Sequence, residues 1–427
     1  MNEIVQPLPR ERAHGAFDRA LRARLLAQLA PLRHGRLTVH DALGTTVLGQ
    51  PEGACELDVA VHVDDPAFWR LLAANGSVGA GEAYIDGLWS CSDLVALVRL
   101  LVRNRDLLDG METGLARVGG WAMRAWHALR RNTRAGSRRN IAAHYDLGNA
   151  FFGLFLSQDL MYSSAFYAGT DETLEDASTR KLERICAQLQ LKPGQRVVEI
   201  GTGWGGFAIH AATHHGVHVT TTTISKEQHA LASQRVQEAG LSDHVTVLLR
   251  DYRDLDGTFD ALVSIEMVEA IGAKYLETYF AKLGSLLAPD GLALVQAITI
   301  EDHRYAQALA SVDFIKRHVF PGSFIPSVAA MLAAKARSTD LALLRLEDFG
   351  GSYALTLHAW RQRFLCNLDA VRAQGFDERF IRLWEFYLAY CEGGFRERSI
   401  GVAHLLMAKP GAREAALSPD MHAGLRA

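Results

Sequence analysis

The sequence has no long hydrophobic run: no stretch of 18 residues is free of both charged residues and helix breakers. A membrane-spanning helix needs about 20 consecutive, predominantly apolar residues, so we expect no membrane span. The first residues, MNEIVQPLPRERAHG, are polar and carry charges of both signs, unlike a signal peptide. We therefore predict a cytoplasmic protein that reaches a membrane only peripherally, at its inner face.

Cysteines are also few, and the net charge is small. The five cysteines are widely scattered and show no CxxC or other metal-ligand spacing, so we expect free thiols and no bound metal. The formal net charge is only -3 at pH 7, which argues against a nucleic-acid partner. With 49% hydrophobic and 22% charged residues, the composition is that of a globular protein rather than a disordered or fibrous one.

The 427 residues are enough for two or three domains. In residues 1–105, a helical pattern at 16–32 precedes short alternating runs at 36–40 and 57–63. This mixture predicts a small N-terminal α+β domain, which we expect to contact lipid.

Residues 106–140 read as a basic connector. Between Leu115 and Asn140 there are seven arginines and two tryptophans but no acidic residue. Basic and aromatic residues together suit an anionic bilayer surface, and the alternative is a solvated linker.

From residue 141 to 427, short β-rich runs alternate with helical segments. This rhythm predicts an α/β fold with a doubly wound, Rossmann-like parallel sheet that carries helices on both faces. Ligands of such sheets bind beyond the carboxyl ends of the strands, so site residues should follow the strands. We expect about seven strands, at 196–200, 217–223, 245–249, 260–265, 291–298, 341–346 and 402–409.

The first of these strands ends in a glycine-rich turn, Glu199-Ile-Gly-Thr-Gly-Trp-Gly-Gly206. Glycines let the backbone approach a ligand, and the next helix offers free N–H groups. The four glycines at 201, 203, 205 and 206 follow an acidic residue, and the turn has no phosphate-binding lysine, so it suits S-adenosylmethionine better than a dinucleotide. We expect Glu199 to organise the methionine end of that cofactor and Gly201 and Gly203 to make room for it. The alternative is an ordinary tight turn.

Polar residues after the next two strands complete the predicted cofactor site. Thr223 and Gln228 are candidates for the ribose hydroxyls, although Ser225 also fits as the N-cap of a helix. Asp251 is the candidate for the adenine amino group and Tyr252 for the ring, and the alternative for Asp251 is a simple turn former.

Several longer motifs resemble the cyclopropane-fatty-acyl-phospholipid synthases, in order and at similar spacing. The resemblance implies a Rossmann-like methyltransferase domain over 141–427, acting on cis double bonds of phospholipid acyl chains at the membrane surface, and a homodimer. It adds Tyr162, Ser163 and Ile224 to the expected cofactor-binding residues. The motifs are residues 144–149, 160–167, 191–206, 223–228, 251–254, 352–357 and 391–396, with 79–89 in the N-terminal domain.

The resemblance also implies how the reaction ends. The alkene attacks the sulfonium methyl, and bicarbonate then removes a proton from the new methyl as the ring closes. In the family a cysteine, a glutamate followed by histidine, a second histidine and a tyrosine hold this bicarbonate. The matching residues here are Ser164, Glu269, Gln296 and Tyr353, and Ala270 replaces the first histidine.

These departures leave alternatives open. Serine and glutamine can still donate hydrogen bonds to bicarbonate, or can be plain buried polar packing. Glu269 can itself take the proton, and a displaced base would leave a methyl or methylene branch without a ring. Glu266, three residues earlier, can share a face with Glu269 and raise one pKa, but only Glu269 matches the family's glutamate, and the alternative for Glu266 is a solvated first-turn acid. Outside lipid chemistry, the alternatives are a small-molecule N-methyltransferase and a catalytically silent sensor.

Overall fold

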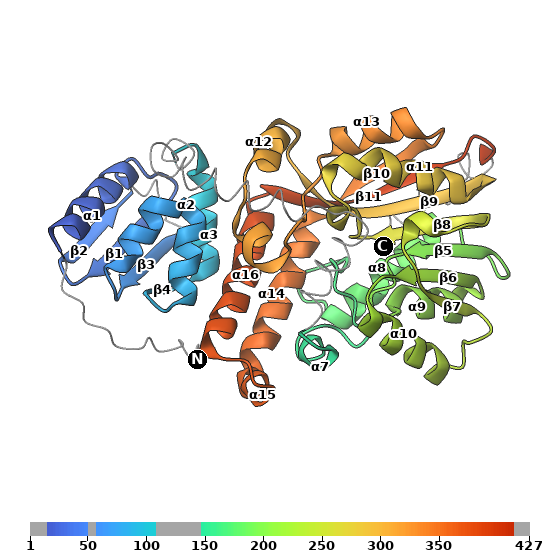
Figure 1. The fold of residues 1–427 in the computed structure, drawn as a ribbon, viewed down its shortest axis with the longest axis horizontal. Helices are drawn as coiled ribbons and strands as arrows, with labels where there is room; N and C mark the ends of the chain where they lie inside the picture. The colour runs from blue at the N-terminus through green and yellow to red at the C-terminus, as the bar shows by residue number, and fades with distance from the viewer. Residues whose placement is uncertain (1–14, 50–56, 108–146, 414–427) are drawn as a thin grey trace. The chain divides into compact units, whose positions relative to one another are not determined.

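The computed structural model describes residues 15–49, 57–107 and 147–413 and divides the chain into two compact units (Figure 1). Unit 1 combines the N-terminal part of the chain with Ser311–Val319 and Arg361–Ser399. Unit 2 contains the remaining residues from Arg130 onwards. The units are therefore not continuous in sequence, unlike the predicted ranges 1–105 and 141–427.

Unit 1 contains a four-stranded sheet in the order β2-β1-β3-β4, in which β1 and β3 are parallel. Strands and helices alternate irregularly along the chain, as expected for an α+β arrangement. The strands are β1 (Arg36–Asp41), β2 (Gly44–Leu48), β3 (Asp58–Val63) and β4 (Trp89–Cys91), and the helices are α1 (Ala16–Leu29), α2 (Ala67–Ile85) and α3 (Leu94–Arg103).

A late segment of the chain completes unit 1. Helix α16 (Glu378–Arg396) packs against α2 and α3. At Gly393 the approach to α3 is so close that a Cβ would lie 2.6 Å from Cγ1 of Val98. This close packing explains why residues 361–399 belong to unit 1. The segment also contains α15 (Leu368–Ala373), and α14 (Gly350–Cys366) leads into it.

Unit 2 is built on a seven-stranded sheet in the order β10-β11-β9-β8-β5-β6-β7. Strands β5 to β9 are parallel to one another, whereas β11 is antiparallel to both β9 and β10. This confirms the predicted doubly wound sheet. The strands are β5 (Arg196–Ile200), β6 (His218–Thr223), β7 (Val245–Leu249), β8 (Phe259–Ile265), β9 (Leu287–Ile300), β10 (Ala342–Asp348) and β11 (Ile400–Ala408).

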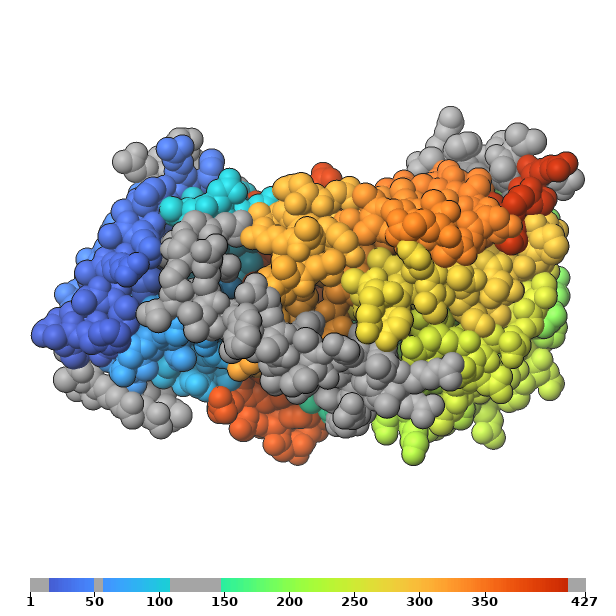
Figure 2. Space-filling view, turned by 45° about the horizontal axis from the view of Figure 1, so that its top comes forward, coloured from blue at the N-terminus to red at the C-terminus, as the bar shows by residue number. Residues whose placement is uncertain are grey.

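Helices cover both faces of this sheet, because alternate strand residues point to opposite sides. Val197 belongs to a core cluster with α8 and α9, whereas Val198 belongs to a second cluster with α11 and α13. One side of α13 forms part of the molecular surface (orange in Figure 2), while its Met331 and Ala334 are buried in the core. The helices are α7 (Asn149–Phe152), α8 (Leu174–Gln188), α9 (Gly206–His215), α10 (Lys226–Glu238), α11 (Leu276–Leu286), α12 (Tyr305–Ala310) and α13 (Val328–Ser338).

The strand order places a topological switch point between β5 and β8. From β5 the chain runs through β6 and β7 on one side and then crosses to β8 and β9 on the other. Ligands of open α/β sheets bind where the order reverses, at the carboxyl ends of the strands. Here these ends are the glycine loop after β5 and Glu266 after β8. Within the described ranges, no helix is long and apolar enough to cross a membrane.

Candidate active site

The glycine loop after β5 has the shape of a cofactor cradle. Gly201, Gly203 and Gly205 all have positive φ angles, of 98°, 52° and 86°. A Cβ added at Gly203 would meet no atom within 4 Å, so open space lies above this residue. Helix α9 begins directly afterwards at Gly206 and presents its N-terminal N–H groups. The loop therefore fits a ligand that contacts the backbone closely.

Glu199 is buried at the end of β5, beside its β6 partner Thr221. The hydroxyl of Thr221 lies 2.5 Å from Oε2 of Glu199 and 2.7 Å from the hydroxyl of Thr202. Burial is the main cause that raises the pKa of Glu199 to about 8, against the lowering effects of Thr221 and Lys181. Its predicted role toward the methionine end of the cofactor stays a prediction.

Lys181 on α8 is a buried cation that the sequence analysis missed. Its Nζ donates a hydrogen bond of 2.9 Å to Oγ of Ser163, an expected cofactor residue. Burial lowers the pKa of Lys181 to about 8, although Asp159, Glu266 and Glu199 act in the opposite direction. A signal was present, because Lys181 follows Ala177 and Ser178 at helical spacing on the buried face of α8.

The residues predicted for the ribose contact each other. Oγ1 of Thr223 donates to Oε1 of Gln228 over 2.8 Å, and both side chains are buried. Ser225 accepts a hydrogen bond from the backbone N–H of Gln228 and caps α10, which confirms the helix-cap alternative. Ile224 lies between these residues and is partly exposed. The ribose contacts themselves stay predictions.

The carboxylate of Asp251 is hydrogen-bonded to Arg253, two residues along the chain. Its two carboxylate oxygens accept hydrogen bonds of 2.8 and 2.6 Å from Arg253, and its Oδ1 also accepts from the backbone N–H of Arg253. This confirms the turn-forming alternative for Asp251. Tyr252 is buried, which raises its pKa to about 12. Their proposed adenine contacts remain to be tested.

Three of the four residues that matched the family's bicarbonate ligands meet at Glu266. Its Oε1 accepts hydrogen bonds from the backbone N–H of Ser164 at 2.9 Å and from Nε2 of Gln296 at 2.7 Å. Its Oε2 accepts one of 2.7 Å from the hydroxyl of Tyr353. The alternative that Glu266 is a solvated first-turn acid is therefore wrong. Its φ is 48°, and its side chain contacts Gln296 of β9.

Ser164 contributes its main chain to this cluster rather than its side chain. The hydroxyl of Ser164 donates to the carbonyl of Ala165 at 2.8 Å, and the residue is completely buried. The expected hydrogen bond from the serine hydroxyl to an anion is therefore not what the structure provides at this position.

His404 fixes the orientation of the Gln296 side chain and was also missed. It lies opposite Gln296 on β11, and its Nε2 is 3.0 Å from Oε1 of Gln296. Its Nδ1 is 3.2 Å from Nε2 of Gln188. Burial lowers the pKa of His404 to about 3, so the ring is neutral. Because Gln188 donates to Nδ1, the ring proton is on Nε2, and this N–H donates to Oε1 of Gln296. The Nε2 group of Gln296 is thereby directed toward Glu266.

Glu269 has a different environment from Glu266. Its Oε1 accepts a hydrogen bond of 2.5 Å from the backbone N–H of Ile298, and its Oε2 is buried without a hydrogen-bond partner among the described residues. Burial, with repulsion from Glu266 as the second cause, raises the pKa of Glu269 to about 8. The expected coupling of the two carboxyl groups is thus present. A catalytic role for Glu269 stays a prediction.

Aromatic rings connect the cluster to the expected cofactor residue Tyr162. The ring of Tyr162 lies 5.2 Å from that of Phe152 and 5.3 Å from that of Trp360. The ring of Trp360 is in turn 6.2 Å from Tyr353, edge to face. Aromatic faces attract cations, so this group suits a site in which positive charge is present or forms.

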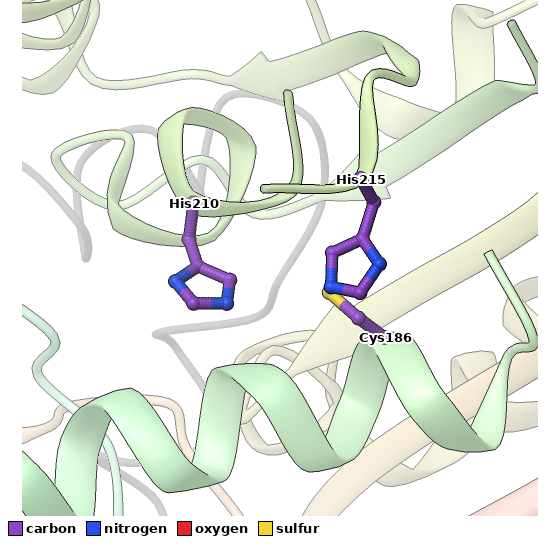
Figure 3. Close-up of side chains that lie close together, drawn as sticks. All are labelled: Cys186, His210 and His215. Carbon is purple, nitrogen blue, oxygen red and sulfur yellow. The ribbon is translucent and has the colours of Figure 1, made fainter. Parts of the chain in front are cut away.

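A second cluster lies between α8 and α9 (Figure 3). The ligand atoms of Cys186, His210 and His215 lie within 4.8 Å of one another. Nε2 of His210 and of His215 are 3.2 and 3.1 Å from Oε2 of Glu183, and burial raises the pKa of the Cys186 thiol well above its usual range. His215 ends α9, whereas the glycine loop precedes its first residue. We interpret this cluster as a contact between the two helices, remote from the chemistry.

Comparisons with known proteins agree with this site. The family model described as "Mycolic acid cyclopropane synthetase" matches residues 132–405. The chain is 35% identical to "Tuberculostearic acid methyltransferase UfaA1" of Mycobacterium tuberculosis, over 93% of this chain and 92% of that protein. It is 37% identical to the cyclopropane-fatty-acyl-phospholipid synthase of Escherichia coli K12, over 80% of this chain and 85% of that protein.

Solved structures show the same fold. The cyclopropane synthase MmaA2 of Mycobacterium tuberculosis superposes with a TM-score of 0.60 at 28% identity, covering 64% of this chain and 98% of that one. The mycolic acid cyclopropane synthase CmaA1 in complex with SAH gives the same values. Coclaurine N-methyltransferase, at 18% identity and a TM-score of 0.59, covers 77% of this chain and 99% of that one and shares the fold alone.

Fold, glycine loop and relatives together define an S-adenosylmethionine-dependent methyltransferase of the cyclopropane-synthase type. The chain belongs to the mycolic acid cyclopropane synthetase family. S-adenosylmethionine is thereby confirmed as the cofactor. The basic connector at 106–140 lies almost entirely outside the described residues.

Proposed function

We propose that the protein transfers a methyl or methylene group from S-adenosylmethionine to the cis double bond of unsaturated phospholipid acyl chains. The observation that carries this proposal is the carboxylate cluster at Glu266, one strand away from the glycine loop and linked through Tyr353 to an aromatic group. A reaction that passes through a carbocation needs an anion and aromatic faces at this position. The relatives named for acyl-chain substrates support the same chemistry.

The cofactor supplies an electrophilic methyl group on a sulfonium. In the proposal, Gly201 and Gly203 admit it to the backbone, and Glu199 orders its methionine end. The remaining expected contacts are Tyr162, Ser163, Thr223, Ile224, Gln228, Asp251 and Tyr252. Ser164, Gln296, Tyr353 and Glu269 surround the reacting carbon atoms. The aromatic rings exclude water, so the cation persists until it loses a proton.

Bicarbonate, which the resemblance implied, does not fit the site as it stands. The donors available to it would be the N–H of Ser164, the amide of Gln296 and the hydroxyl of Tyr353. All three already donate to Glu266, so we assign no step to bicarbonate. The negative charge of Glu266 would also repel a second anion of this size.

A ring-free product is the second candidate. The relative that matches over 93% of this chain is named for tuberculostearic acid and as a methyltransferase rather than as a cyclopropane synthase. A proton acceptor held by the protein, rather than a free anion, decides which proton the cation loses. A methyl-branched, still unsaturated chain follows if Glu266 takes a proton from the chain, whereas a methylene branch follows if a hydride first shifts onto the cationic carbon and Glu266 then takes a proton from the new methyl.

We further propose that the protein acts peripherally at the cytoplasmic face of the membrane and as a homodimer, on the family resemblance. The N-terminal domain and the basic connector are the proposed membrane-binding parts. The arginines beside Trp121 and Trp126 would each contribute about 1 kcal/mol near an anionic surface.

The decisive experiment uses the purified chain, vesicles of cis-unsaturated phosphatidylglycerol and methyl-deuterated S-adenosylmethionine. Mass spectrometry of the fatty acids should find a cyclopropane ring or a methylene branch that carries two deuterons, if the new methyl loses one deuteron. Mild hydrogenation then separates them, because a methylene branch gains two hydrogens and a ring gains none. An unsaturated chain with three deuterons indicates proton loss from the chain itself. Unlabelled lipid, with label transferred to added amines instead, would overturn the proposal in favour of an N-methyltransferase.

A further inference from the structure

Glu266 is an intrinsic anion built into the site. Two donors that can only donate, the N–H of Ser164 and the amide of Gln296, converge on its Oε1. The third donor, the hydroxyl of Tyr353, faces Oε2. A carboxylate with three such partners is held in one position as an acceptor.

The backbone supports a functional reason for this arrangement. The φ of Glu266 is 48°, in the left-handed region where a side chain costs about 1–2 kcal/mol relative to glycine. Such strain persists only where the surroundings enforce it, and it is concentrated at functional sites. Here the N–H of Glu266 is also fixed, donating 2.8 Å to the carbonyl of Gln296.

The hydrogen bonds allow Glu266 to gain a proton without losing a partner. Oε1 keeps both of its donors in either protonation state. At Oε2 the bond to Tyr353 can reverse, because a phenol hydroxyl accepts as well as donates. Oε2 is therefore the atom suited to receive a proton. Burial raises the pKa of Glu266, which brings the carboxylate closer to the strength of a useful base.

We propose that Glu266 is the general base of the methyl transfer, and that its carboxylate takes the place of the bicarbonate ion. This inference rests on the proposed function. The alkene π electrons form a C–C bond to the sulfonium methyl as the C–S bond breaks onto sulfur, which leaves S-adenosylhomocysteine and a carbocation. For a ring, a C–H bond of the new methyl gives its electron pair to a C–C bond with the cationic carbon; for a branch, a C–H bond on a carbon adjacent to the cation, after a hydride shift where a methylene forms, gives its pair to a double bond. In each case the proton passes to Oε2 of Glu266. Solvent removes the proton after product release.

Two substitutions separate this role from a structural one. Glu266→Gln keeps the shape but cannot accept the proton, and we expect its turnover to fall on the order of 10²–10⁴-fold. Glu266→Gly removes the carboxylate and relieves the strain of the positive φ, which offsets part of the cost of removing the acceptor of three hydrogen bonds. It vacates the place of the carboxylate between the N–H of Ser164, the amide of Gln296 and the hydroxyl of Tyr353, where an added anion can bind.

The test measures labelled lipid in carbon-dioxide-free buffer, with and without added bicarbonate. We expect the wild type to be active without bicarbonate and Glu266→Gly to be inactive until bicarbonate restores at least tenfold activity. Binding of ¹³C-bicarbonate, followed by NMR, should appear only in the glycine variant. Glu238→Gln, on the exposed end of α10, is the control and should match the wild type.

Some outcomes would overturn only the role of Glu266, and another would overturn the proposed function as well. Wild-type activity that requires bicarbonate, or a Glu266→Gln variant with full activity, would overturn the role of Glu266 while leaving the lipid methyltransferase intact. Wild-type protein that labels no lipid at all would overturn the proposed function, and the catalytic role of Glu266 with it.

Discussion

The hydroxyl of Tyr353 donates a hydrogen bond of 2.7 Å to Oε2 of Glu266, joining the first turn of α14 to the residue that follows β8. These residues are 87 positions apart in the sequence. Their contact makes Tyr353 a partner of a protein carboxylate rather than of a free anion.

Tyr353→Phe should slow turnover about tenfold to 100-fold. Losing a hydrogen bond to a charged group costs about 1.5–3 kcal/mol, and here the loss falls on the proposed proton acceptor. Steady-state rates with vesicles, together with calorimetric titration of S-adenosylmethionine, check this. A variant with unchanged turnover, or one whose main defect is cofactor affinity, would contradict the assigned position of Tyr353.

His404→Leu should remove a pH-dependent part of the stability. In the folded protein the pKa of His404 is about 3, compared with about 6.5 when unfolded. The unfolded chain therefore binds more protons between these values, and the wild type loses stability as pH falls from about 6.5 toward 3. Urea unfolding at several pH values should show a shallower loss in the variant, with a constant penalty of about 1–3 kcal/mol for the unpaired Gln296 amide. His303→Leu, at an exposed position, is the control and should leave the slope unchanged.

Glu269→Gln should act in the opposite pH direction. The folded pKa of Glu269 is about 8 and its ordinary value is 4.5, so the folded state holds a proton that the unfolded state has lost. Stability from this group is complete below about pH 4.5 and is lost as pH rises through about 8. The free energy of unfolding of the variant, relative to the wild type, should therefore increase between pH 5 and pH 8, by an amount on the order of a few kcal/mol. Parallel curves for the two proteins would show that Glu269 is ionised throughout.

Gly203→Val should abolish cofactor binding without unfolding the protein. The residue has a φ of 52°, and its missing Cβ faces open space. Gly240, after α10, also has a positive φ, of 70°, and open space around its missing Cβ. Both valine variants should lose about 1–2 kcal/mol of stability, but only Gly203→Val should weaken S-adenosylmethionine binding more than tenfold. Equal binding by the two variants would move the cofactor away from the loop.

The sequence predicted the parallel sheet because its central strands β5, β8 and β9 are mostly buried on both faces. The predicted strands 196–200 and 245–249 coincide with β5 and β7, and the capping serine at 225 fixed the start of α10. Unit 1 was less readable. Its helix α2 runs on to Ile85 past the non-helical Gly76 and contacts α1 and α16, which are long-range contacts that no local pattern contains.

The features of the site also divide into those that the sequence predicted and those that it did not. The glycines after β5 and the polar residues after β6 and β7 were enough to predict the cofactor, and the resemblance to the cyclopropane-fatty-acyl-phospholipid synthases implied the class of reaction. The same resemblance favoured Glu269, because only that glutamate stands at the position of the family's glutamate. What local pattern does not contain is the direction of a side chain. The positive φ of Glu266, the amide of Gln296 turned by His404 from the antiparallel strand β11, and the hydroxyl of Tyr353 arriving from α14 are all decided by contacts between distant segments. The sequence alone determined the sheet and its cofactor loop, since burial and turn chemistry are local properties. Only the tertiary structure decided which carboxylate receives the three hydrogen bonds, because donors from separate segments of the chain must converge on that one carboxylate.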